Sequence, residues 1–295
     1  MLDLHHCGGR LLSDTQHAAG QHAIPAQLLA LRGRQAAEIG HPRARGLCQP
    51  QRIARIGDQP GKFVGRNSQY SGGGYSDAYV VMARTGGDGP RGISAFVVEA
   101  GTPGLSFGKL EDKMGWRAQP TAQVQFDDCC IPTENLLGEE GKGFTYAMAG
   151  LDGGRLNISA CALGGAQSAF DKTLAYMSER KAFGQSLDQF QALQFRLAEL
   201  EVKLQSARLF LRHAAWKLDS GAKDATKACA MAKLLVTDNA FDVANQCLQL
   251  HGGYGYLSDY GIEKLVRDLR VHQILEGTNE IMRVIISRAL LAERR

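Results

Sequence analysis

One carboxylate stands in a sequence context that suits proton-transfer chemistry. Glu276 lies in the run HQILEGTNEIMR (272–283), directly before Gly277, which frees the backbone, and Thr278, a residue type that favours helix starts. The helix dipole alone favours a carboxylate there, so its presence needs no catalytic role. The same placement suits a general base on a short rigid loop, beside backbone N–H groups that can hold an anion. Both interpretations follow from the spacing.

Three further motifs combine glycine with arginine or histidine. In QLHGGYGY (249–256) adjacent glycines either end a helix or let the backbone approach a phosphate or a flat ring. In SERKAFGQ (178–185) Arg180 stands at the end of a helical pattern, where a cation also complements the helix dipole. In LDGGRLN (151–157) two glycines and Arg155 fall within a helical pattern. Each such glycine costs a helix about 1 kcal/mol, which favours a packing or ligand reason for it.

The composition is that of a folded protein and excludes several functional classes. The 295 residues are 44% apolar and 22% charged, which excludes intrinsic disorder, and no uncharged run approaches the ~20 residues that cross a bilayer. Residues 1–70 hold nine of the 34 basic and four of the 30 acidic residues, so the excess positive charge lies there. The nearly neutral remainder argues against a nucleic-acid partner. Seven cysteines without a CxxC pair indicate reduced thiols in a cytoplasm, with neither a disulfide framework nor a metal site.

The elements that would position these motifs change type along the chain. Runs rich in β-branched and aromatic residues, bounded by glycine and proline, predict strands over 77–84, 92–100 and 121–129. Helical periodicity follows and predicts helices over 143–178, 191–218, 224–250 and 279–293. The predicted core-facing residues of the second helix are Leu193, Leu197, Leu200, Leu204, Ala207, Leu211 and Ala214. Those of the third are Leu234, Thr237, Phe241, Ala244 and Leu248.

This succession predicts an α+β fold in which a partial antiparallel β domain is followed by an antiparallel four-helix bundle. The predicted β domain covers 71–139 and the bundle covers 140–295. Residues 1–70 are atypical, with no sustained periodicity apart from a short helical pattern over 25–38. We interpret them as a disordered or mistranslated segment.

Taken together, the motifs resemble one enzyme family. The order GLDGGR (150–155), ERKAFGQ (179–185), LHGGYGY (250–256) and RVHQILEGTNEI (270–281) resembles the C-terminal domain of the acyl-CoA dehydrogenase flavoenzymes. The stretch SGGGYSDAYVVMAR…GISAFVVE…GTPGLSFGK…DKMGW…FDDCCIP resembles the second half of their middle β domain. Within the family, KMGWRAQPTAQV and VHQILEGTNEIMR look most like the isobutyryl-CoA, short branched-chain members.

The resemblance implies a reaction and its partners. Family members remove the α-proton of an acyl-CoA with a carboxylate, which Glu276 matches, and pass a β-hydrogen as hydride to FAD. The expected substrate is a short, branched, isobutyryl-like acyl-CoA, and the product is its 2-enoyl-CoA. A straight short-chain (butyryl) dehydrogenase is one alternative, and a truncated, non-catalytic helical oligomerisation module is another. Electrons would pass to an electron-transfer flavoprotein. The expected assembly is a homotetramer, a dimer of dimers, in the cytoplasm or, in a eukaryote, the mitochondrial matrix.

The resemblance also assigns binding residues. The positions that match FAD contacts, in part to the flavin of a neighbouring subunit, are Ser71, Arg180, Phe190, Gln191, Gln249, Leu250, His251, Gly252, Gly253, Thr278, Asn279 and Glu280. The positions that match acyl-CoA contacts are Asp152, Gly153, Gly154, Arg155 and Arg288. For Arg288, a solvated helix face is an almost equal alternative.

The first part of the chain departs from the family pattern. Family members carry an N-terminal helical domain and a TEPxxGSD-type loop, whereas residues 41–55 read HPRARGLCQPQRIAR. A sequence rich in arginine, glutamine and glycine is typical of a GC-rich gene translated out of frame. We therefore expect a frameshift or a mis-assigned start upstream of about residue 70. If the chain is real as written, we expect the substrate cleft to lack one wall.

Overall fold

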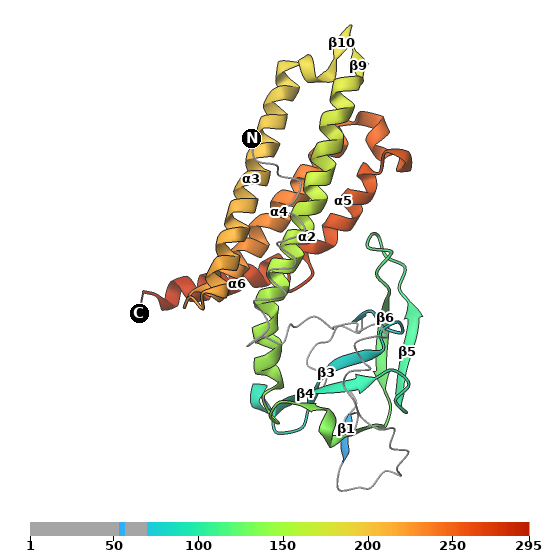
Figure 1. Ribbon diagram of the computed structural model, residues 1–295, viewed down its shortest axis with the longest axis vertical. Helices are drawn as coiled ribbons and strands as arrows, with labels where there is room; N and C mark the ends of the chain where they lie inside the picture. The colour runs from blue at the N-terminus through green and yellow to red at the C-terminus, as the bar shows by residue number, and fades with distance from the viewer. Residues whose placement is uncertain (1–52, 57–69, 295) are drawn as a thin grey trace. The chain divides into compact units, whose positions relative to one another are not determined.

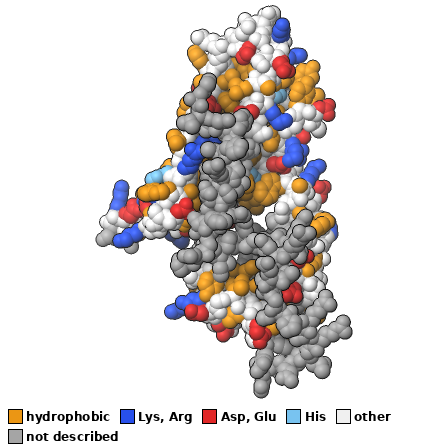
Figure 2. Space-filling model, in the orientation of Figure 1, with side chains coloured by type: hydrophobic (Ala, Val, Ile, Leu, Met, Phe, Trp, Pro, Cys, Tyr) orange, Lys and Arg blue, Asp and Glu red, His pale blue; other side chains and the backbone are white. Residues whose placement is uncertain are grey.

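The computed structural model describes residues 53–56 and 70–294. They form two compact units. The first comprises the described part of Met1–Lys113 together with Arg117–Leu151, and the second comprises Met114–Trp116 and the described part of Asp152–Arg295. The expectations for a helix over 25–38 and for an altered reading frame lie outside the described residues. Figure 2 shows the acidic and basic side chains of the described residues interspersed over one face.

The described part of the first unit is built from short antiparallel strands in three small sheets (Figure 1). One sheet pairs β1 (Ile53–Ile56) with β7 (Cys129–Pro132). In the second sheet the strand order is β2 (Tyr70–Ser71), β6 (Thr121–Phe126), β5 (Leu105–Leu110). In the third sheet the strand order is β3 (Ala78–Arg84), β4 (Ile93–Glu99), β8 (Leu136–Leu137). Alternate residues of β3 are buried, as a strand with one face on a core requires. Their core partners come from β4 and β7.

The predicted strands correspond to β3, β4 and β6, and the α+β fold class is confirmed. Strands β2, β5, β7 and β8 were not predicted. In β5 three residues are half-buried, three are exposed and Gly108 interrupts the pattern, while β7 is four residues long and ends in proline. Strand β1 lies inside the segment interpreted as disordered or mistranslated.

The second unit consists mainly of helices (Figure 1). Helix α2 (Gly143–Glu179) begins in the first unit and is followed by a hairpin of β9 (Lys181–Ala182) and β10 (Gln185–Ser186). Helices α3 (Gln191–Asp219), α4 (Ala225–Leu250), α5 (Ile262–Arg270) and α6 (Asn279–Ala292) complete the unit. Helix α5 was not predicted because it is short and largely polar. No helix within the described ranges is long and apolar enough to cross a membrane.

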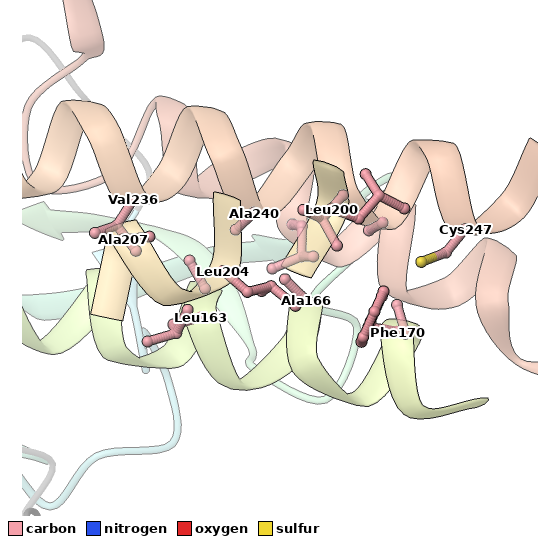
Figure 3. Close-up of a cluster of buried hydrophobic side chains, with 14 of the residues drawn as sticks. Leu163, Ala166, Phe170, Leu200, Leu204, Ala207, Val236, Ala240 and Cys247 are labelled. Atoms are coloured by element: carbon pink, nitrogen blue, oxygen red, sulfur yellow. The ribbon is translucent and has the colours of Figure 1, made fainter. Parts of the chain in front are cut away.

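The core of the second unit lies between α2, α3 and α4, with Leu269 of α5 closing one side. Figure 3 shows Leu163 of α2 beside Leu204 of α3, with Phe170 of α2 near Cys247 of α4. On α3, the five predicted residues from Leu200 to Ala214 are buried, so its predicted face is confirmed.

The predicted face of α4 is only partly right. Thr237 and Ala244 are buried, but Leu234, Phe241 and Leu248 are only partly buried. The core instead receives a neighbouring face of small side chains: Ala228, Ala232, Val236, Ala240, Val243 and Cys247. Because α4 packs against α3, α5 and α6, several of its faces are covered, and small residues let α3 approach closely.

Candidate active site

Glu276 lies in a tight loop between α5 and α6. The 3₁₀ turn Val271–Gln273 follows α5, and the loop then reverses direction with Glu276 at φ 56° and Gly277 at φ 88°. Glycine adopts this left-handed conformation without strain, whereas a glutamate there costs of order 1 kcal/mol and must be held in place by its surroundings. The Thr278 hydroxyl accepts a hydrogen bond from the Ile281 N–H at 3.4 Å and caps α6, as predicted.

The carboxylate of Glu276 rests against a glycine of α2. A Cβ atom added at Gly154 would overlap Oε2 of Glu276 and lie 2.9 Å from its Cδ. The glycine therefore makes room for the carboxylate, and this supplies the packing reason that the LDGGR motif called for. Burial raises the pKa of Glu276, while the positive charges of Arg155 and Lys233 act in the opposite direction.

Arg155 is one of two buried cations beside this carboxylate. Its Nη1 donates to Oδ1 of Asp152 at 2.7 Å, and Oδ2 of Asp152 accepts from the Thr226 hydroxyl at 2.6 Å. Among the described residues, the buried Nε of Arg155 has no hydrogen-bond partner. A buried donor without a partner is costly, which is typical of a group that waits for a ligand. The adjacent Gly153 is half-buried, and a Cβ there would meet nothing within 4 Å.

Lys233 is the second cation, and sequence reasoning missed it. Its side chain is fully buried, and Nζ donates to the Gly277 carbonyl at 2.8 Å and to Oδ1 of Asn279 at 2.7 Å. The Asn279 amide donates to Oδ1 of Asp238 at 2.7 Å and to the Thr237 hydroxyl at 3.1 Å. A lysine within the apolar run ACAMAKLLV was the available signal, because buried lysines require partners.

A second cluster forms an open pocket of about 530 Å³ where α2 and α4 end. Arg180 lies over the Tyr254 ring, 5.2 Å from its centroid. The Tyr176 ring stacks on His251 at 4.3 Å, and its hydroxyl donates to the His251 carbonyl at 3.3 Å. The predicted residues on this pocket are Arg180, Gln249, Leu250, His251, Gly252 and Gly253, and those that sequence reasoning missed include Tyr176, Arg196 and Tyr254.

The remaining predicted residues lie elsewhere. Phe190 and Gln191 are at the start of α3, and the Phe190 ring is 6.4 Å from that of Phe183, which is 97% exposed at the hairpin tip. Glu280 is exposed in the first turn of α6, and Arg288 is exposed further along this helix. Ser71 is exposed in the first unit.

The two clusters lie well apart along α2, one about a third of the way along the helix and the other near its C-terminal end. Gly154 and Tyr176 are separated by 22 residues of continuous helix, which corresponds to about 33 Å. One pocket therefore does not contain both the carboxylate and the aromatic cluster.

The fold and these two clusters define a class of flavoenzyme domains. Residues 141–291 match the acyl-CoA dehydrogenase C-terminal domain, and residues 63–129 match the acyl-CoA dehydrogenase middle domain. The chain belongs to the acyl-CoA dehydrogenase family.

Relatives in the family include dehydrogenases for short acyl groups. Isobutyryl-CoA dehydrogenase of Bos taurus is 55% identical over 229 residues, covering 78% of this chain and 55% of the relative. A short-chain specific acyl-CoA dehydrogenase of Clostridium acetobutylicum is 46% identical over 216 residues, covering 73% and 57%. The structure of butyryl-CoA dehydrogenase from Megasphaera elsdenii matches with a TM-score of 0.73 and 41% identity, covering 76% of this chain and 60% of that one. The chain thus spans little more than half the length of the curated relatives it matches.

Proposed function

We propose that this chain carries the catalytic base of an acyl-CoA dehydrogenase, with Glu276 as the residue that accepts the α-proton of a short acyl-CoA. The observation that carries the proposal is the placement of this carboxylate, which is held on a strained loop, given room by Gly154 and flanked by two buried cations. A general base works best when its pKa approaches the working pH, and burial moves Glu276 in that direction.

Proton removal next to a thioester leaves negative charge that the site must stabilise. Arg155 offers a buried N–H that has no partner among the described residues, and a permanent positive charge beside Glu276. In the proposed role, Arg155 and its partner Asp152 bind the acyl-CoA, and Gly153 and Gly154 let it approach α2 closely. Arg288 is kept as a further substrate contact, although its exposed position equally fits a solvated helix face.

The pocket at the far end of α2 has the chemistry of a dinucleotide site. Arg180 and Arg196 suit a pyrophosphate, and Tyr176 and Tyr254 suit a flat ring. A Cβ at Gly252 or Gly253 would meet nothing within 4 Å, so the backbone there is open to a ligand. When bound, FAD supplies the acceptor for the hydride that leaves the β-carbon. The further FAD contacts we propose are Ser71, Phe190, Gln191, Gln249, Leu250, His251, Thr278, Asn279 and Glu280.

The separation of the two clusters supports a site shared between copies of the chain. The aromatic pocket and Glu276 lie about 33 Å apart along α2, so we propose that each pocket holds the cofactor that serves the carboxylate of a neighbouring copy. A stripe on α3 supports an assembly: Phe195, Val202, Leu209 and Trp216 recur every seven residues, and each is more than half exposed. Following the resemblance, we propose a homotetramer.

The proposed substrate is isobutyryl-CoA, because the Bos taurus relative is named for it and is 55% identical to this chain. Butyryl-CoA is the second candidate, supported by the Megasphaera elsdenii structure. The proposed electron acceptor is an electron-transfer flavoprotein, and the proposed location is the cytoplasm or, in a eukaryote, the mitochondrial matrix.

An absorption experiment tests the function. The purified protein should be yellow, and anaerobic isobutyryl-CoA should bleach its flavin band faster than butyryl-CoA does. Glu276→Gln should keep the colour and the affinity for acyl-CoA but lose bleaching by at least ~10³-fold, because an amide cannot accept the proton. Normal bleaching by this variant would place the base elsewhere.

A non-catalytic oligomerisation module is the second candidate function, favoured by the stripe of exposed apolar side chains on α3. Protein that assembles but stays colourless with added FAD would support this candidate.

A further inference from the structure

Lys233 is the most deeply buried charged side chain among the described residues of the second unit, and the function proposed above uses it only as a positive charge beside Glu276. It projects from α4 toward the loop before α6, whereas the small apolar side chains of α4 face the bundle core. A lysine is removed from water only at considerable cost unless strong acceptors receive its N–H groups. The groups that accept hydrogen bonds from the Lys233 ammonium therefore show which part of the structure this side chain stabilises.

Both acceptors belong to the segment that carries Glu276. Nζ of Lys233 donates to the Gly277 carbonyl at 2.8 Å, and Gly277 has a left-handed backbone with φ 88°. It also donates to Oδ1 of Asn279 at 2.7 Å, the first residue of α6. The ammonium therefore bridges the loop and the start of the next helix, on either side of the capping residue Thr278.

The network continues back into α4 and leaves Asn279 little freedom. Its amide donates to Oδ1 of Asp238 at 2.7 Å and to the Thr237 hydroxyl, and that hydroxyl donates to the Lys233 carbonyl at 2.8 Å. The two bonds from the Asn279 amide tie the start of α6 to the 26-residue helix α4. The strained backbone of Glu276 needs such external support.

Resting on the proposed role of Glu276 as base, we propose that Lys233 is the positioning residue for this carboxylate. Its ammonium fixes the Glu276–Thr278 loop through the Gly277 carbonyl and Asn279, and its charge favours the ionised, proton-accepting form of Glu276. The loop geometry and the charge state of the base thus depend on one buried side chain.

The charges around Lys233 are consistent with this role. Burial lowers the pKa of Lys233 to about 8, while the negative charges of Asp238, Glu276 and Glu280 raise it and that of Arg155 lowers it. The lysine is therefore mainly charged at neutral pH, and its charge lowers the pKa of Glu276 in turn.

Titration of Glu276 in flavin-free protein tests the proposal without requiring catalysis. The carboxyl C=O infrared band that disappears in Glu276→Gln reports the protonation of Glu276 alone. Lys233→Met should raise the midpoint of this titration by about one pH unit, because a nearby positive charge is lost. It should also speed hydrogen exchange of the amides at 277–281 by at least ~10-fold. Lys233→Gln, which keeps a donor but no charge, should raise the midpoint with a smaller change in exchange.

Val236→Ala is the matched control, since Val236 is fully buried on the same helix but faces the bundle core. It should lower stability while leaving the Glu276 midpoint and the exchange at 277–281 unchanged. The proposal is overturned if folded Lys233→Met leaves both readouts unchanged, if Val236→Ala moves them equally, or if neither lysine variant folds, since Lys233 would then be a structural residue. A colourless wild-type protein would count against the proposed function but would not alter these titrations.

Discussion

At the scale of single residues, the base is placed at the expense of stability. Glu276 combines a left-handed backbone with a carboxylate that burial disfavours in its ionised form. Gly154, Arg155 and Lys233 each offset part of this cost, by leaving space or by supplying positive charge. A side chain kept in such an environment is typical of a functional position.

This trade-off predicts a stability change that depends on pH. Because burial raises the pKa of Glu276, the folded chain holds this proton more tightly than the unfolded chain. The associated stability is therefore present at low pH and is lost as the pH rises from the ordinary carboxyl range through the raised pKa. The Glu276→Gln variant has no carboxyl group to ionise at this position and does not lose this stability. Its stability relative to the wild type should therefore increase as the pH rises from the ordinary carboxyl range through the raised pKa of Glu276. We expect a melting temperature about 2 °C higher near neutral pH.

Urea unfolding of both proteins at about pH 5 and about pH 8 measures the difference. If the stability advantage of Glu276→Gln over the wild type became smaller as the pH rises, this would contradict the raised pKa of Glu276.

At the scale of elements, helix α2 contributes one face to the core and, at Gly154, leaves space for the side chain of Glu276. Alanine normally stabilises a helix relative to glycine by about 1 kcal/mol, yet at Gly154 the added methyl group would overlap Glu276. Gly154→Ala should therefore displace the carboxylate and slow flavin reduction by roughly 10²-fold, without lowering the stability of the helix.

Gly164→Ala is the matched control for this substitution. Gly164 is exposed on the same helix, and a Cβ there would meet nothing within 4 Å. This variant should gain up to ~1 kcal/mol of stability and keep the rate of flavin reduction. Equal rates in the two variants, measured by stopped-flow absorbance, would show that Gly154 does not make room for the base.

Periodicity and local chemistry were sufficient for some of these elements. The spacing of apolar residues identified the buried face of α3, and a threonine after a glycine identified the start of α6. On α4 the same method failed in part, because this helix has neighbours on several sides and no single stripe marks its core face.

Contacts between distant residues could not be read from the sequence. Gly154 and Glu276 lie on different elements far apart in the chain, so only the folded helices bring them together. The resemblance assigns Asn279 to the cofactor, but it does not indicate that the Asn279 side chain hydrogen-bonds with Lys233, Thr237 and Asp238. Lys233 itself has no motif, and the acceptors that explain its burial lie on a different element.

At the scale of the whole molecule, the proposed function requires more than one copy of the chain. The second unit carries an aromatic, cationic pocket and a carboxylate that lie well apart along α2, and a stripe of exposed apolar side chains on α3. Exposed leucine and tryptophan side chains aligned at helical spacing are costly in water and are typical of a protein interface.

The stripe predicts an assembly that charge can disrupt. Leu209→Lys combined with Trp216→Lys places two cations on this face, so association of copies through α3 should weaken by at least ~10²-fold, while the isolated fold keeps its helical content. Sedimentation velocity at micromolar concentration measures the change in mass. Ala175→Lys on α2 is the matched control, because it adds a charge at an exposed position away from the stripe and should leave the assembly intact. If the double variant and the wild type sediment with the same mass, α3 does not form the interface, and the proposed sharing of the cofactor pocket must depend on a different surface.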